Sequence, residues 1–356
     1  CFAGLIVMPS RGRVPAGKRE VSMTTDKNPT GATRREFMTT GAAVGAAFMI
    51  GASKDSLAQE RPLRAGLIGC GRRGTGAAMD LLNADATCTI TALADVFEDN
   101  LKAGREKLTR QSERVKVNDG TCFHGFDAYK QMMATDVDIV LLCTPPGFRS
   151  THLRAAVEAG KHVFMEKPAG TDPAQIRSVI ETGALAAKKG LSIVAGTQRR
   201  HQVQYRDLIP RVHDGAIGEI LGAQAYWVGD YDYYPAVLRQ PGWSDMEAQL
   251  RNWNYFTWLS GDHICEQHIH NLDVANWVKG GKDKPAEYPV KANGMGGRQV
   301  RADKKYGEIF DHHFVEYEYA DGTCMFSQCR QMPGCFNSVS EFVHGSKGTS
   351  NPSGSM

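Results

Sequence analysis

The feature that most constrains the fold is a glycine-rich turn between an apolar strand and a helix. Residues 63–74 read Leu-Arg-Ala-Gly-Leu-Ile-Gly-Cys-Gly-Arg-Arg-Gly, and a helical pattern follows over 77–82. Gly69 allows a tight turn, Gly71 leaves room for backbone to approach a pyrophosphate, and Gly74 lets the helix pack closely on the strand. The pattern therefore predicts a dinucleotide-binding strand–turn–helix unit.

The residues around this turn indicate which dinucleotide is bound. The helix N-terminus offers free N–H groups and a partial positive charge to phosphates, and Arg72 and Arg73 stand at its start, so we count both among the cofactor-binding residues. A second apolar strand, 88–94, ends in Asp95. A carboxylate there accepts hydrogen bonds from a ribose diol and repels a 2′-phosphate. The sequence therefore favours NAD over NADP.

Strands and helices alternate from residue 61 to residue 196. An apolar run over 137–143 has no polar alternation, which is typical of a strand buried on both faces. Further elements are predicted as a helix over 152–159, strands over 162–165 and 191–195, and a helix that starts at Asp172-Pro173. Such alternation predicts an α/β Rossmann domain with a doubly wound parallel sheet.

The pattern changes in residues 197–356. Strands are expected over 220–228, 288–294, 315–332 and 339–344, the third of them a hairpin that turns at Asp321-Gly322. Strands without intervening helices predict an α+β domain with an open antiparallel sheet, which we assign to substrate binding and oligomerisation. Because the sequence stops just after a strand, we expect the domain to be truncated at its C-terminus.

The first 58 residues are predicted to be an export leader. Thr-Arg-Arg-Glu-Phe-Met over 33–38 is a twin-arginine signature, and small residues before Gln59 suit a signal peptidase. The weakly apolar run over 39–52 is shorter than the ~20 residues of a membrane span. We therefore expect a periplasmic or otherwise exported protein that meets the twin-arginine translocase and has no stable membrane anchor.

Charge and cysteine usage narrow the function further. The leader holds eight Lys or Arg and four Asp or Glu, so of the net charge of +3 the rest of the chain contributes −1. Such a balance gives no reason to expect nucleic acid or an anionic membrane as a partner. The nine cysteines are scattered and lack CxxC spacing, which predicts neither a disulfide framework nor a cysteine metal site.

Two clusters carry the candidate chemistry. Glu166-Lys167-Pro168 follows a parallel strand, so Lys167 is expected to point toward the nicotinamide region of the cofactor crevice. The second cluster lies in a predicted helix that opens near Asp262 and stops at Gly280-Gly281. At 100° per residue, one polar stripe of that helix contains four side chains: His263, Glu266, His270 and Asp273.

The chain resembles the family of glucose–fructose oxidoreductase and inositol dehydrogenase (Gfo/Idh/MocA) from residue 63 to about residue 350. The matching motifs are Gly69-x-Gly71-x-x-Gly74, Ala94-Asp95, Thr144-Pro145, Glu166-Lys167-Pro168 and Glu266-x-x-x-His270-x-x-Asp273. The resemblance implies NAD(P) between the two domains and a sugar or polyol as substrate. Thr144, Pro145, Glu166 and Lys167 are accordingly added to the cofactor-binding residues.

The resemblance also implies roles for individual residues. Lys167 matches the family's catalytic lysine, His270 its general acid/base and Asp273 its ligand for a substrate hydroxyl, while Glu266 stands where aspartate is commoner. The residue types suit oxidation of a secondary alcohol, since a near-neutral imidazole can take the hydroxyl proton while an ammonium stabilises the developing alkoxide. Arg199 and His263 complete the expected substrate contacts.

For several residues a purely structural role remains open beside the functional one. The aromatic residues of 227–258 either stack on a sugar or pack in a core. His263 and His268 suit structural roles, and His312-His313 are expected to be exposed. A zinc ion on His263, Glu266 and His270 has suitable spacing but is disfavoured, because the Rossmann context explains these residues and HExxH is absent. We therefore predict no metal.

Three functions follow from these observations. The first is an exported oxidoreductase with tightly held NAD, which acts on a sugar, polyol or glycoside and forms homo-oligomers. The second is a redox-neutral NAD-dependent glycoside hydrolase or lyase, and the third is a non-catalytic sugar-binding protein on the same scaffold. Retention of Lys167 and His270 favours the first.

Overall fold

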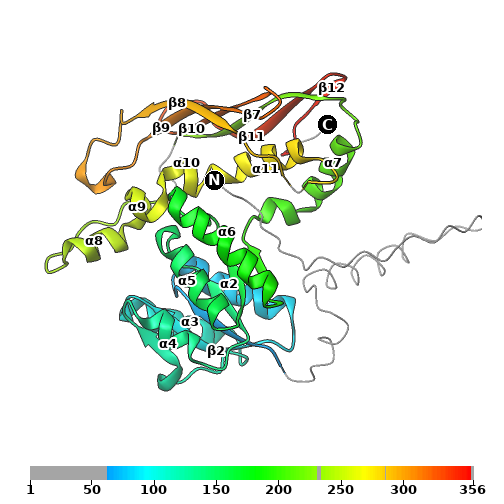
Figure 1. Cartoon of the computed structure of the whole chain (residues 1–356). Coiled ribbons are helices and arrows are strands. Elements are labelled where there is room, and N and C mark those ends of the chain that lie inside the picture. Colours follow the sequence, from blue (N-terminus) through cyan, green and yellow to red (C-terminus); the bar gives the residue numbers. More distant parts are fainter. Residues whose placement is uncertain (1–61, 231–233, 285, 354–356) are drawn as a thin grey trace, which may run out of the picture.

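The computed structural model describes residues 62–230, 234–284 and 286–353. The predicted leader with its twin-arginine segment lies outside these residues, as do Tyr231 and Tyr233 of the aromatic segment. The described chain forms two parts, each built on a six-stranded sheet, and the helices α10 and α11 lie where the two parts meet (Figure 1).

The first part is a parallel sheet with strand order β3-β2-β1-β4-β5-β6. Its strands are β1 (Arg64–Ile68), β2 (Thr89–Asp95), β3 (Cys122–His124), β4 (Ile139–Leu142), β5 (His162–Met165) and β6 (Ile193–Ala195). Its helices are α2 (Arg72–Ala84), α3 (Glu98–Gln111), α4 (Ala128–Met133), α5 (Arg149–Glu158) and α6 (Pro173–Lys188). The order reverses between β1 and β4, which confirms the predicted doubly wound sheet and places a ligand crevice at that point.

Two apolar cores hold the helices on opposite faces of this sheet. Leu82 of α2 and Leu101 and Leu108 of α3 pack in one core, whereas α4, α5 and α6 contribute to the other through side chains such as Met132 and Leu153. The local sequence signals act as expected, because the carboxylate of Asp172 caps α6 by accepting from the Gln175 amide at 2.9 Å.

The glycine-rich turn has the geometry that its sequence predicts. Gly69 has φ +95°, a conformation that favours glycine, and a Cβ on Gly74 would lie 1.8 Å from the Gly69 carbonyl oxygen. A Cβ on Gly71 would meet no atom within 4 Å. Gly69 and Gly74 are therefore required by the fold itself, whereas Gly71 borders open space at the uncapped N-terminus of α2.

The second part is a mixed, largely antiparallel sheet, which confirms the predicted α+β domain and adds one parallel pair of strands. Its order is β12-β11-β7-β10-β9-β8, and β10 runs parallel to β7. The strands are β7 (Ile220–Gly229), β8 (Lys291–Gly297), β9 (His312–Glu318), β10 (Cys324–Gln331), β11 (Ser338–Gly345) and β12 (Gly348–Ser350). The parallel pair arises because β7 lies between β10 and β11, so the chain crosses β7 after the predicted β9–β10 hairpin.

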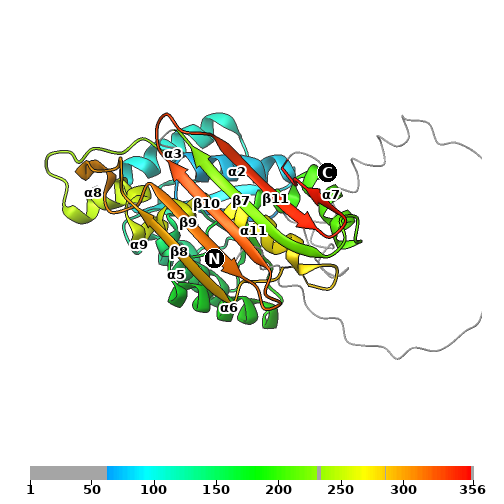
Figure 2. The same ribbon diagram turned by 90° about the horizontal axis from the view of Figure 1, so that it is seen from above.

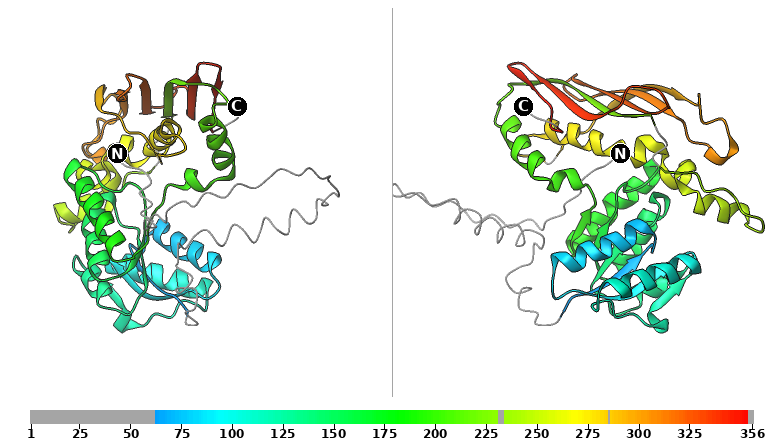
Figure 3. Two further views of the ribbon diagram at one scale, coloured as in Figure 1. Left: turned by 45° about the vertical axis from the view of Figure 1, so that its right-hand side comes forward. Right: turned by 180° about the vertical axis from the view of Figure 1, so that it is seen from behind.

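The helices of the second part cover one face of this sheet. They are α7 (Val203–His213), α8 (Asp245–Arg251), α9 (Thr257–Ser260), α10 (Asp262–Glu266) and α11 (Ile269–Gly280), with α8 and α9 extending to one side. Short 3-10 turns lie at 119–121, 146–148, 198–201, 253–255 and 304–306. The views from above and from the side show no other described element over the outer face of the sheet (Figures 2 and 3).

Two element predictions in this part were wrong. The strand expected over 288–294 begins at Lys291 and continues to Gly297, because the amide of Glu287 still bonds to the Asn276 carbonyl of α11. The single helix expected from Asp262 breaks into α10 and α11, since the amides of Gln267 and His268 both donate to the His263 carbonyl.

The described helices also bear on membrane insertion. Within 62–230, 234–284 and 286–353, no helix is both long and apolar enough to cross a bilayer.

The eight cysteines described in these ranges are all free thiols.

The tight contact at Gly74 predicts a large difference between two alanine substitutions in one turn. Gly74→Ala should lower the free energy of unfolding by about 1–3 kcal/mol or more, because its methyl group overlaps the Gly69 carbonyl. Gly71→Ala, whose methyl group enters open space, is the matched control and should change stability little. Urea denaturation followed by circular dichroism measures both, and equal losses would contradict this reading of the turn.

Candidate active site

The two parts of the chain meet in an ion pair between Lys167 and Glu266. Lys167 lies in the loop after β5 and Glu266 at the end of α10. The Lys167 ammonium lies 2.6 Å from the Glu266 Oε1 and also donates to the Glu266 backbone carbonyl. Their side chains are 16% and 8% exposed, so water does little to weaken this attraction. The catalytic lysine expected from the sequence is thus held by the second domain.

A buried arginine supports the loop that carries Lys167. Arg149, at the start of α5, is 1% exposed and donates from Nη1 to the Leu142 carbonyl at 2.6 Å and from Nε to the Pro168 carbonyl at 3.1 Å. The Lys167–Pro168 peptide bond is cis. Burial lowers the pKa of Arg149. Sequence reasoning missed this residue, because a single arginine after Thr-Pro-Pro has no periodic or motif signal.

Glu166 connects the same loop to the glycine-rich turn. Its Oε1 accepts from Arg73 Nε at 2.6 Å, and Arg73 also pairs with Asp80. A Cβ on Gly196 would lie 2.8 Å from Glu166 Oε2, so the chain after β6 packs directly on this carboxylate. Arg73, expected to contact the cofactor, therefore joins the N-terminus of α2 to the Lys167 loop.

His270 lies close enough to Lys167 to be affected by its charge. Burial first, and then the positive charges of Lys167 and Arg199, lower the pKa of His270 to about 2. Its ring stacks against Trp227 of β7 with ring centres 5.9 Å apart. At neutral pH the imidazole is therefore uncharged.

The predicted polar stripe is wrong as a single helical surface, because the break leaves His263 and Glu266 on α10 and His270 and Asp273 on α11. His263 faces His313 of β9, with ring centres 4.9 Å apart. Asp273 forms a buried bidentate ion pair with Arg200, with oxygen–nitrogen distances of 2.6–3.0 Å. Only Glu266 and His270 of the four remain near Lys167, so the structure does not bring His263, Glu266 and His270 together as a zinc site.

Arg199, which the sequence predicted to contact the substrate, lies close enough to His270 for its charge to affect the pKa of that residue. It pairs with Glu341 of β11, a fully buried carboxylate that also accepts from Asn271 Nδ2 at 2.8 Å. The Arg199 guanidinium lies 5.9 Å from the Trp227 ring centre. Burial raises the pKa of Glu341, and Arg199 opposes that rise. Glu341 and Arg200 were missed. In the sequence, a glutamate on a strand and an arginine next to another arginine look like ordinary surface residues, and nothing indicates that they are buried.

A cleft opens beside the glycine-rich turn, at the carboxyl ends of β1, β2 and β4. Its volume is about 160 Å³. Five predicted cofactor residues line it: Gly69, Gly71, Asp95, Thr144 and Pro145. Aromatic side chains of both parts also line it, namely Phe97, Phe126, Tyr129, Phe148 and Trp253. Arg72, Gly74, Glu166 and Lys167 are not among its lining residues.

Two polar residues of the cleft are held in fixed orientations. The Asp95 carboxylate accepts from the amides of Cys70 at 2.7 Å and Phe97 at 2.9 Å. The Thr144 hydroxyl lies 3.2 Å from Nδ1 of His152, whose ring stacks on Phe148. Burial and the charge of Arg149 lower the pKa of His152 to about 4.

Comparison with known proteins agrees with this architecture. Residues 63–196 match the protein family Gfo/Idh/MocA, described as an oxidoreductase family with an NAD-binding Rossmann fold. The fold is similar to that of the scyllo-inositol dehydrogenase of Lactobacillus casei, solved with NAD(H) and scyllo-inositol. Its TM-score is 0.61 at 22% identity, over 82% of this chain and 76% of that one. Residues 63–196 therefore form an NAD-binding Rossmann domain, as predicted.

Two curated relatives differ in the activity that their names state. The chain is 26% identical over 263 residues to the D-glucoside 3-dehydrogenase of Escherichia coli K12, which is 73% of this chain and 65% of that protein. It is 26% identical over 170 residues to a glycosyl hydrolase family 109 protein of Streptomyces coelicolor, 47% of this chain and 34% of that protein. The chain thus spans less than two thirds of either relative.

The buried neutral histidines predict a loss of stability in mild acid. His152 and His270, with pKa values of about 4 and about 2, stay neutral in the folded chain, whereas unfolded histidines bind protons below about pH 6.5. Their stabilisation is therefore complete above about pH 6.5 and falls as the pH drops toward their folded pKa values. Between pH 7.0 and 5.5 each should cost about 1 kcal/mol of unfolding free energy.

Urea titrations at the two pH values measure this loss. His152→Phe should reduce the loss of unfolding free energy between the two pH values by about 1 kcal/mol. The phenyl ring that replaces the imidazole can still stack on Phe148 but binds no proton. His344→Ala, at an exposed position on β11, is the control and should leave the dependence unchanged. A pH dependence that His152→Phe does not alter would contradict the assigned pKa.

Proposed function

We propose that this protein is an NAD-dependent oxidoreductase that transfers hydride between nicotinamide and a hydroxyl-bearing carbon of a sugar, polyol or glycoside. The observation that carries the proposal is the pairing of Lys167 with Glu266 next to the neutral imidazole of His270. These groups come from both domains and lie where the Rossmann domain faces the second sheet. The ammonium stabilises negative charge on an alcohol oxygen, and the unprotonated imidazole has a free lone pair for the alcohol proton.

The residues present fit NAD. The uncapped N-terminus of α2 offers amide groups for the pyrophosphate, and Gly71 leaves space that a Cβ would fill. The carboxylate of Asp95 lines the same cleft and suits a ribose diol. Thr144 and Pro145 line the neighbouring wall at the end of β4. When bound, NAD supplies the acceptor for the hydride.

The protein side chains then divide the chemistry between them. The neutral imidazole of His270 accepts the hydroxyl proton of the substrate, and the Lys167 ammonium donates a hydrogen bond to the same oxygen as its negative charge develops. The substrate carbon loses two electrons with the departing hydride, and the C–O single bond becomes a carbonyl. Glu266 positions Lys167 by holding its ammonium from the opposite domain.

The surroundings of His270 favour a polyhydroxylated substrate. Trp227 presents an aromatic ring for stacking, and the nearby pairs Arg199–Glu341 and Arg200–Asp273 supply charged hydrogen-bonding groups. Asp273 is saturated by Arg200 in this structure, so contact with a substrate hydroxyl would be shared between both side chains. The dehydrogenase relatives named above act on a glucoside and an inositol, as their names state.

A redox-neutral glycoside hydrolase is the second candidate, because one relative is a glycosyl hydrolase family 109 protein. In that reaction the oxidation is transient, an acidified C–H is lost with the glycosidic bond, and the hydride returns. The same His270 and Lys167 would serve its first step. The two functions differ in whether reduced cofactor accumulates when a glycoside is supplied.

Turnover of the bound cofactor tests the proposal. We expect the purified protein to carry nicotinamide and to show a rise in absorbance at 340 nm with a polyol or glycoside. His270→Ala and Lys167→Met should each lower kcat about 10²–10⁴-fold, because each removes a group that acts on the reacting oxygen. His344→Ala is the control and should retain activity.

Two results would argue against a dehydrogenase. Release of the aryl group from a chromophoric aryl glycoside without reduced cofactor would favour the hydrolase. Full turnover in His270→Ala would instead revive the non-catalytic interpretation, in which this scaffold only binds sugar.

We further propose export and self-association. The twin-arginine segment at Arg34-Arg35 supports passage through the twin-arginine translocase, and cell fractionation would locate the protein. Tight retention of NAD would then be needed outside the cytoplasm. Homo-oligomer formation is supported by apolar side chains that are exposed on strands of the second sheet: Phe326, Phe342 and Met295.

A further inference from the structure

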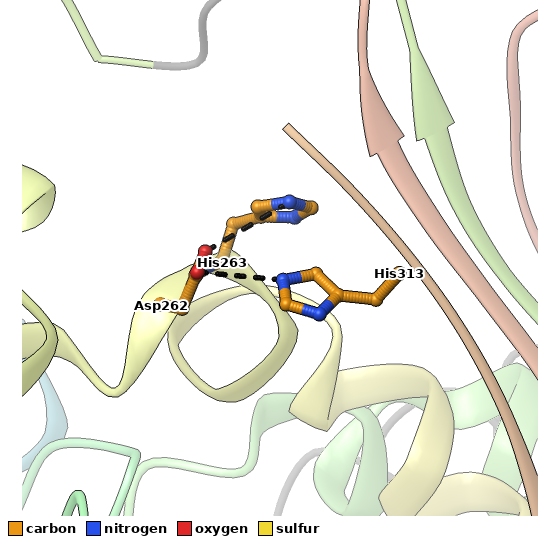
Figure 4. Close-up of side chains that lie close together, drawn as sticks. All are labelled: Asp262, His263 and His313. Carbon is orange, nitrogen blue, oxygen red and sulfur yellow. Dashed lines mark hydrogen bonds and ion pairs between the residues drawn. The ribbon is translucent and has the colours of Figure 1, made fainter. Parts of the chain in front are cut away.

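Three side chains that the proposed reaction does not use meet between α10 and β9. They are Asp262 and His263 at the start of α10 and His313 on the inward face of β9 (Figure 4). One potential ligand atom from each lies within 4.8 Å of the others. Asp262 Oδ1 is 3.9 Å from His263 Nε2, and Asp262 Oδ2 is 3.4 Å from His313 Nε2. The sequence predicted an exposed His313, but its side chain is only 14% exposed.

The two histidines carry nitrogens without hydrogen-bond partners among the described residues. These atoms are both ring nitrogens of His263, and Nε2 of His313 has only the Asp262 carboxylate at 3.4 Å. His263 is 4% exposed, so bulk solvent does not reach these nitrogens. A buried polar group without a partner costs about 1–3 kcal/mol, and buried polar atoms in proteins are therefore almost always satisfied. A bound cation would supply the missing partner to each imidazole.

The carboxylate is held toward the imidazoles by its backbone. Asp262 has φ +65°, a left-handed conformation that is strained for a residue other than glycine. Its oxygens accept from the amides of His263 at 2.5 Å and Phe310 at 2.7 Å, which fixes the carboxylate and leaves further lone pairs. Such strain persists only where the surrounding structure enforces it, and it often marks a functional position.

We propose that Asp262, His263 and His313 bind one divalent transition-metal ion, with Zn²⁺ the best match to the ligand set. Two imidazoles and a carboxylate are common zinc ligands, and imidazole disfavours Mg²⁺ and Ca²⁺ relative to Zn²⁺. A fourth position would be taken by water. This set shares only His263 with the one considered from the sequence.

The position of the site suggests what the metal does. It would join the start of α10 to β9, and α10 ends in Glu266, the residue that holds Lys167. The metal would therefore fix the helix that brings the carboxylate to the catalytic loop, without touching the reacting atoms. A structural role of this kind requires no metal in the redox step.

Metal content tests the proposal directly. The purified full chain is stripped with a chelator and then dialysed against micromolar Zn²⁺. Elemental mass spectrometry should then find about one equivalent of bound zinc. His313→Ala should lose at least nine tenths of that zinc. His312→Ala is the matched control and should keep the bound zinc. His312 directly precedes His313, but its side chain is 42% exposed and its Nδ1 lies 2.7 Å from Asp311.

A second measurement guards against loss of structure. Co²⁺ substituted for zinc should give visible absorption bands in the wild type and in His312→Ala, but not in Asp262→Asn or His313→Ala. Circular dichroism and bound nicotinamide report whether each variant is folded, independently of metal and of turnover. Less than 0.1 equivalent of zinc in folded wild-type protein, or equal zinc in folded His313→Ala, would overturn the proposal.

Discussion

The buried contact between Lys167 and Glu266 is the interaction on which the site depends. Each group alone would be costly to remove from water, and each satisfies the other across the junction of two domains. Arg149 supports the loop on one side through two carbonyls, and α10 supports the carboxylate on the other. The ammonium is consequently fixed by both domains, and a change in how the domains pack would move it relative to the cofactor cleft.

A polar layer lies between the helices and the second sheet. Gln267 bonds to Gln331, His268 Nε2 lies 2.8 Å from the Ser327 hydroxyl, and Asn271 bonds to Glu341. Directional contacts of this kind specify how α10 and α11 sit on the sheet more strictly than apolar packing alone, because a displaced partner leaves a buried polar atom unsatisfied. The same layer includes His270 and the proposed metal ligands. The proposed catalytic base and the groups that fix the helices therefore lie in one interface, between α10 and α11 and the second sheet.

The sequence predicted the Rossmann half well, because its signals are local. The turn at Gly69, the cap at Asp172 and the apolar run of β4 each depend on nearby residues. The second half was harder, since the parallel pairing of β10 with β7 is set by a crossover that no short pattern encodes.

The candidate site shows the same contrast. Lys167 and His270 were found by motif, and the Lys167 charge contributes to the lowered pKa of His270. The helix break at Gln267, however, leaves His263 and Glu266 on α10 and His270 and Asp273 on α11, and helical periodicity cannot anticipate a break that tertiary contacts impose. Arg149 and Glu341 escaped because a buried charge has no sequence signature.

The most direct measurement of the central claim is a double-mutant cycle on Lys167 and Glu266, read as the single-turnover rate of reduction of bound NAD. If Glu266 acts by holding the Lys167 ammonium, Glu266→Gln should slow the wild type but have almost no further effect in Lys167→Met. Losses that simply multiply would show that the two residues act independently, and would contradict the account.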